Sequence, residues 1–127
     1  MSSGVYDSSV ILAAIFREPG AEDALKHSDQ IILSAVSACE IVQVLCLQGM
    51  PEDIAWDELI LIAHRMIDFD GIQAKLAGGL AIKTKKLGLS LGDRACLALG
   101  LRTGSPVVTA ERTWDRCDIG VQVIRIR

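Results

Sequence analysis

Apolar residues along this chain occur in two patterns that predict different elements. Short apolar runs end at polar residues, and longer stretches repeat their apolar positions with helical spacing. We expect strands at residues 4–6, 30–33, 66–69, 106–109 and 121–126. We expect helices at residues 10–16, 21–27, 34–48, 51–65, 70–86 and 89–102, with a turn or short helix at 111–116. Strands that alternate with helices predict α/β architecture, a three-layer α/β/α sandwich around a mostly parallel, five-stranded sheet.

The composition agrees with this architecture. Half of the 127 residues are hydrophobic, but only two Trp, one Tyr and two Phe are aromatic. The core must therefore be built from Ala, Leu, Ile and Val, which suits helices packed on both faces of a parallel sheet. The length predicts one domain over residues 1–127. A net charge of −3 argues against binding nucleic acid through a large basic surface.

The cysteines indicate a reducing environment. Cys39, Cys46, Cys96 and Cys117 form no CxxC pair, and the first three lie in apolar helical patterns, where Cys behaves as a small hydrophobic residue. We therefore expect reduced, structural thiols and a cytoplasmic protein. No apolar run reaches the roughly 18 residues of a membrane span, and the first residues do not resemble a signal peptide.

Four acidic residues are expected at one edge of the sheet. Asp7 and Glu111 follow predicted strands, Glu40 lies early in the helix after the second strand, and Asp93 begins the helix before the fourth. In a parallel sheet every strand ends, and every following helix begins, at the edge where ligands bind. The helix that leads into a parallel strand begins there too. We call these four residues the acid cluster.

Each acid also has a simpler explanation. Ser90 and Ser37 precede Asp93 and Glu40 by three positions, so each pair resembles a capping box; Asp7 fits an N-cap, and Glu111 could complement a helix dipole. Such roles contribute ~1 kcal/mol each but do not explain why four carboxylates gather. Gathered carboxylates repel one another unless a cation lies between them. Ligands that are all oxygen favour Mg²⁺ or Mn²⁺ over zinc or copper.

Four short motifs resemble a known family. They are Tyr-Asp-Ser-Ser at 6–9, Ser-Ala-Cys-Glu at 37–40, Leu-Ser-Leu-Gly-Asp-Arg-Ala at 89–95 and Thr-Ala-Glu-Arg-Thr-Trp at 109–114. Their order and spacing resemble PIN domains and, more narrowly, the VapC-type toxins of type II toxin–antitoxin modules. The resemblance spans essentially the whole chain, and the motif around Asp93 is its most specific part.

This resemblance implies an Mg²⁺- or Mn²⁺-dependent endoribonuclease that hydrolyses RNA phosphodiester bonds. The acid cluster occupies the family's acidic positions, and Thr109 matches the hydroxyl residue that supports the site. Glu111 stands where Asp is common in the family, so Asp115 is an alternative fourth acid. The arginines beside these acids are candidates for contacts with RNA phosphates: Arg94, Arg112 and Arg116.

The resemblance also implies protein partners, a cognate antitoxin and a second copy in a homodimer. The helix at 10–16 and the helix that carries Trp56 are apolar on more than one face, which is typical of interfaces. Two other classes stay open: a catalytically inactive PIN-like module that binds protein or RNA, and a receiver-type phosphoacceptor domain. The receiver domain fits poorly because Asp7 has no acidic neighbour and residues 121–127 contain no lysine.

Overall fold

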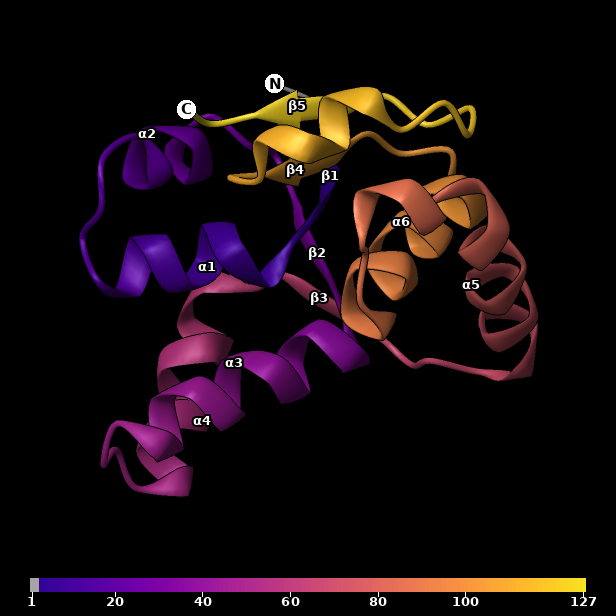
Figure 1. The fold of residues 1–127 in the computed structure, drawn as a ribbon. Helices are drawn as coiled ribbons and strands as arrows, with labels where there is room; N and C mark the ends of the chain where they lie inside the picture. The colour runs from indigo at the N-terminus through magenta and orange to yellow at the C-terminus, as the bar shows by residue number, and fades with distance from the viewer. Residues whose placement is uncertain (1–2) are drawn as a thin grey trace.

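The computed structural model describes residues 3–127, which form a five-stranded sheet flanked by helices (Figure 1). The strands are β1 (Gly4–Tyr6), β2 (Ile31–Ser34), β3 (Arg65–Ile67), β4 (Val107–Thr109) and β5 (Val123–Arg125). The helices are α1 (Ser8–Ile15), α2 (Ala21–Lys26), α3 (Ala35–Leu47), α4 (Glu52–Ile62), α5 (Gly71–Lys83) and α6 (Leu91–Thr103). Two 3₁₀ turns complete the fold, η1 (Lys85–Leu87) and η2 (Arg112–Arg116). The α/β prediction is therefore confirmed.

The strand order is β3-β2-β1-β4-β5, and every neighbouring pair is parallel. The chain moves outward from β1 to β3 and then returns to the other side of β1 with β4. The order thus reverses between β1 and β4, and parallel sheets bind ligands beyond the carboxyl ends of the strands at such a point. Asp7 follows β1 there, and Thr109 ends β4.

Alternating strand residues feed two separate cores. Tyr6, Leu33 and Val108 pack with α1, α3 and α4 on one face of the sheet, whereas Val5 and Val107 pack with α5, α6 and η2 on the other. Figure 1 shows the two groups of helices on opposite sides of the strands. This arrangement is the predicted three-layer sandwich, with both faces of the short strands covered.

Helix α6 supplies most of the second core. It is buried at every position from Ala95 to Gly100. A Cβ placed on Gly100 would lie 2.5 Å from Cγ2 of Val107, so the glycine lets α6 approach β4 closely. The predicted Ser90 capping box is confirmed at the N-terminus of this helix.

Some local predictions were wrong. The first helix begins at Ser8 rather than Val10; its buried residues are Val10, Ile11 and Ala13, whereas Phe16 just beyond it is 40% exposed. The long helix predicted to residue 86 ends at Lys83, where Thr84 Oγ1 donates to the Leu80 carbonyl and a 3₁₀ turn follows. All four cysteines are free thiols, but Cys39 is exposed, contrary to the buried position expected for it. None of the helices within residues 3–127 combines the length and hydrophobicity that a membrane span requires.

Candidate active site

Asp7 lies at the point where the strand order reverses, and two hydroxyl groups hold it. Its Oδ2 accepts hydrogen bonds from Ser9 Oγ at 2.6 Å and from Thr109 Oγ1 at 3.0 Å. Asp7 occupies the N-cap position of α1, but its side chain makes no capping bond. The simple capping explanation therefore fails for this residue, whose carboxylate instead faces the end of β4.

Ser9 is a site residue that the sequence prediction missed. Its hydroxyl donates to Asp7 and accepts a hydrogen bond from the backbone N–H of Ala110 at 3.1 Å. Ser9 therefore ties the end of β1 to the loop after β4, beside the Thr109 contact. Its signal in the sequence was the Asp-Ser-Ser start, but its link to Ala110 spans 101 positions and depends on the sheet order.

The surroundings of the Asp7 carboxylate disfavour its ionised form. Its side chain is only 2% exposed, and Oδ1 is buried without a hydrogen-bond partner. Its pKa is raised to about 6, mainly by burial and also by the charges of Asp93 and Glu111, while the hydrogen bonds from Ser9 and Thr109 oppose the rise. A cation beside Oδ1 would supply the missing partner and stabilise the ionised form.

Glu40 extends from the second turn of α3 toward the same region. Burial raises its pKa first, followed by the charges of Asp7 and Asp93, and hydrogen bonding to Ser8 opposes them. Its Oε1 is also buried without a partner. Ser34, whose hydroxyl accepts from the Val36 N–H, caps α3. The Ser37–Glu40 capping box considered from the sequence is therefore wrong.

Asp93 caps its helix, and its charge also acts on Asp7 and Glu40. Its Oδ2 accepts from the Ser90 N–H at 2.9 Å, and its own N–H donates to Ser90 Oγ. The fully buried thiol of Cys96 lies one turn further along α6. Desolvation raises the pKa of Cys96 well above its ordinary value, with added contributions from the charges of Asp7, Asp93 and Glu40. Three acids from three elements thus surround the start of α6.

The structure distinguishes the two candidates for the fourth acid. Glu111 follows β4, its backbone N–H donates to Thr109 Oγ1 at 3.0 Å, and its charge contributes to the raised Asp7 pKa. Asp115 lies on η2 and forms a 2.8 Å ion pair with Arg125 of β5. Glu111 therefore interacts with the Asp7 site, whereas Asp115 is bound to the edge strand.

The three predicted RNA-binding arginines differ in their surroundings. Arg94 is half-buried, and its Nη1 donates to the Ala77 carbonyl of α5 at 2.9 Å, so it fastens α6 to α5. Arg112 and Arg116 are exposed on η2, in the segment that follows Glu111. Of the three predicted arginines, Arg112 and Arg116 are therefore the exposed ones.

The donor set fits a hard divalent cation. No three His, Cys, Asp or Glu side chains within residues 3–127 already form a ready-made metal site. The acid cluster nevertheless offers only oxygen ligands, and two of these oxygens, Asp7 Oδ1 and Glu40 Oε1, are buried and unpaired. Oxygen atoms are the ligands that Mg²⁺ and Mn²⁺ prefer, and a bound cation would relieve the repulsion among the carboxylates. Asp7, Glu40 and Asp93 would hold the ion, with Glu111 beside them.

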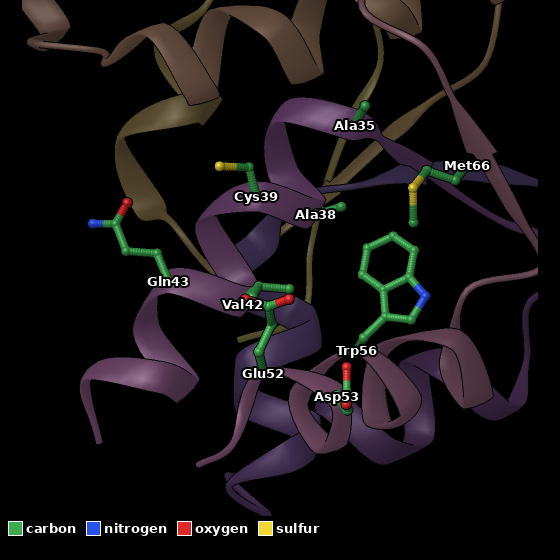
Figure 2. Close-up of a pocket in the computed structure, with 9 residues that line it drawn as sticks. All are labelled: Ala35, Ala38, Cys39, Val42, Gln43, Glu52, Asp53, Trp56 and Met66. Carbon is green, nitrogen blue, oxygen red and sulfur yellow. The ribbon is translucent and has the colours of Figure 1, made fainter. Parts of the chain in front are cut away.

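An apolar groove lies between α3 and α4 (Figure 2). Its volume is about 610 Å³, and Figure 2 shows the Trp56 ring turned toward Met66 across it. The lining residues are Ala35, Ala38, Cys39, Val42, Gln43, Glu52, Asp53, Trp56 and Met66. Cys39, which lines the groove, directly precedes Glu40 on α3.

Comparison with known proteins assigns the family. The PIN domain family model matches residues 5–120, so the chain belongs to the PIN domain family. No curated protein is similar enough in sequence to match this chain.

Similar solved structures support the fold. They include VapBC2 from Rickettsia felis bound to a DNA fragment from its promoter (TM-score 0.74, 15% identity, 98% of each chain covered). A toxin–antitoxin complex from Klebsiella pneumoniae matches with TM-score 0.76 and 16% identity over 98% of each chain. VapC20 from Mycobacterium tuberculosis, a sarcin-ricin loop cleaving toxin, matches with TM-score 0.73 and 15% identity over 94% of this chain and 99% of that one.

Proposed function

We propose that this protein is an Mg²⁺- or Mn²⁺-dependent endoribonuclease and the toxin of a toxin–antitoxin pair. The observation that carries the proposal is the Asp7 carboxylate. It is buried at the reversal point of a parallel sheet, has one unpaired oxygen, and lies in the field of other acids. Membership of the PIN domain family and the similarity to toxin–antitoxin structures support the same function.

The residues divide the work by position. Ser9 and Thr109 fix Oδ2 of Asp7, which leaves Oδ1 free for a cation held with Glu40 and Asp93. A divalent cation bound there lowers the pKa of a water molecule and stabilises negative charge on a phosphate. The exposed guanidinium groups of Arg112 and Arg116 bind RNA phosphates and place the backbone across the site.

Cleavage of RNA tests this proposal. We expect the wild type to cut RNA when Mg²⁺ or Mn²⁺ is present and to lose this activity in EDTA, and we expect Asp7→Asn and Asp93→Asn to be inactive. Equal activity in all three proteins would contradict the metal-site assignment. RNA binding without any cleavage by the wild type would favour the inactive PIN-like module instead.

The fourth acid has its own test. We expect Glu111→Gln to lower the cleavage rate by roughly 10-fold to 100-fold, because Glu111 contributes to the field at Asp7 and supports its ligand set. Asp115→Asn is the matched control, since it removes one carboxylate that pairs with Arg125. Rates measured at saturating Mn²⁺ compare the two. A larger loss for Asp115→Asn would assign the role to Asp115.

The groove between α3 and α4 is our candidate site for an antitoxin segment. Its surface is mainly apolar, and both of its charged residues, Glu52 and Asp53, are acidic. A partner segment that fills it should therefore carry apolar anchors flanked by Lys or Arg. Such a segment would lie against Cys39 and extend past Glu40, where it would block access to the acid cluster.

Trp56 should dominate that interface. Its side chain lines the groove and remains 44% exposed, and buried Trp residues often contribute about 2 kcal/mol or more at interfaces. We expect Trp56→Ala to weaken binding of a cognate antitoxin by roughly 30-fold. Leu61→Ala, which alters an exposed α4 residue outside the groove lining, should change the affinity little. Titration calorimetry measures both, and equal losses would place the interface elsewhere.

We also propose that the outer face of α5 joins two copies of the chain. Ile72, Leu76 and Ile82 are 60%, 36% and 84% exposed, which is unusual for side chains of this size. An apolar hollow of about 480 Å³ lies between this face and Ile119. Sedimentation of the isolated protein should show a dimer, and a monomer at all concentrations would contradict this proposal.

A further inference from the structure

Gly92, in the first turn of α6, occupies an unusual place beside the acid cluster. A Cβ placed on it would overlap Cδ, Oε1 and Oε2 of Glu40. Its backbone is ordinary α-helix, so no left-handed conformation calls for glycine at this position. Helices generally favour Ala over Gly. The missing side chain is therefore explained by the space that the Glu40 carboxylate occupies.

The overlap involves only the end of one flexible side chain. A methyl group at position 92 would meet the carboxyl of Glu40 rather than backbone or core atoms. The chain can adapt by rotating the Glu40 side chain away from α6, without a shift of backbone or core atoms. This differs from Gly100, where an added Cβ would meet Val107 of the sheet at 2.5 Å.

We propose that Gly92 is a positioning residue, which makes room for the Glu40 carboxylate against the N-terminus of α6 and so keeps it within the acid cluster. The expected effects of Gly92 on Mn²⁺ binding and on RNA cleavage rest on the proposed metal-dependent function. The placement of Glu40 over a bare stretch of helix backbone is a property of the metal-free chain. A side chain at position 92 would turn Glu40 away from Asp7 and Asp93.

The first test measures Mn²⁺ binding by calorimetry, with RNA cleavage as a second readout. We expect Gly92→Ala to bind Mn²⁺ roughly 10-fold to 100-fold more weakly and to cleave RNA correspondingly more slowly. Gly78→Ala, a helical glycine whose added Cβ meets open space, is the matched control and should bind and cleave like the wild type. Wild-type affinity in Gly92→Ala would overturn the proposal.

The second test asks whether position 92 acts through Glu40. In a Glu40→Asp background, whose carboxylate is shorter by one methylene, Gly92→Ala should cost far less Mn²⁺ affinity than it does in the wild type. The same loss in both backgrounds would overturn the proposal, because the effect would then not pass through Glu40.

A third test needs no metal and separates this inference from the proposed function. In a Glu40→Ala background, Gly92→Ala should raise the urea midpoint of the metal-free protein, as Gly78→Ala should in the wild type. In the wild-type background that gain should be absent. If the wild type neither binds Mn²⁺ nor cleaves RNA, the proposed function fails, and this cycle alone decides the inference. An equal gain in both backgrounds would overturn it.

Discussion

Asp7→Asn is expected to abolish RNA cleavage and at the same time to stabilise the metal-free protein. The carboxylate is buried, and burial raises its pKa to about 6, so its ionised form opposes folding at neutral pH. An Asn side chain keeps an oxygen that can accept from Ser9 and Thr109 but carries no charge. Cleavage should fall by roughly 10³-fold or more, because a cation contributes several kcal/mol of transition-state stabilisation.

The gain in stability should approach about 3 kcal/mol at about pH 8, the free energy that corresponds to the rise of the Asp7 pKa from 3.8 to about 6. Urea unfolding of the metal-free proteins measures it. Asp23→Asn, which alters an exposed carboxylate on α2, is the control and should change the stability little. A strong loss of stability in Asp7→Asn would show that the carboxylate stabilises the folded state, contrary to this prediction.

The stability of the metal-free wild type should fall as the pH rises from about 4 to about 7. The folded pKa of Asp7 lies above its unfolded value of 3.8, so the folded state binds the proton more tightly. Its stabilising contribution is complete below pH about 4 and is lost as the pH rises through about 6. Glu40, whose pKa is raised too, acts in the same direction.

Unfolding in urea across this pH range measures the effect, which should reach about 3 kcal/mol for Asp7 alone. The slope should shrink in Asp7→Asn and also in wild type saturated with Mn²⁺, since bound metal favours the ionised carboxylate. A wild-type stability that rises over this pH interval, with the same slope in Asp7→Asn, would mean that the ionised Asp7 carboxylate does not destabilise the folded state.

The fold was largely predictable because short local patterns in the sequence indicate most of its strands and helices. Short apolar runs that end at Asp7 and Ser34 predicted β1 and β2, and the Ser90–Asp93 pair predicted the start of α6. The errors lay where one side chain decides the boundary. Thr84 ends α5 early by bonding to the carbonyl of Leu80, a choice that apolar periodicity does not reveal.

The site was predictable only in part, because its details depend on contacts between distant segments. The edge argument selected Asp7 and Asp93 from the order of strands and helices alone. It could not select Ser9, whose partner Ala110 follows another strand, nor Gly92, whose meaning lies in Glu40 of a different helix. Likewise Cys39 belongs to an apolar stretch, and only the packing of α3 against α4 shows that it lines an open groove.

Titration of the metal-free protein with Mn²⁺ tests the central claim most directly, because the acid cluster is proposed to exist for a cation. Calorimetry at about pH 6 should show saturable binding to the wild type, release of protons from Asp7, whose pKa is about 6, and no binding to Asp7→Asn. Equal binding of Mn²⁺ by the wild type and Asp7→Asn, or no binding by either protein, would contradict the account.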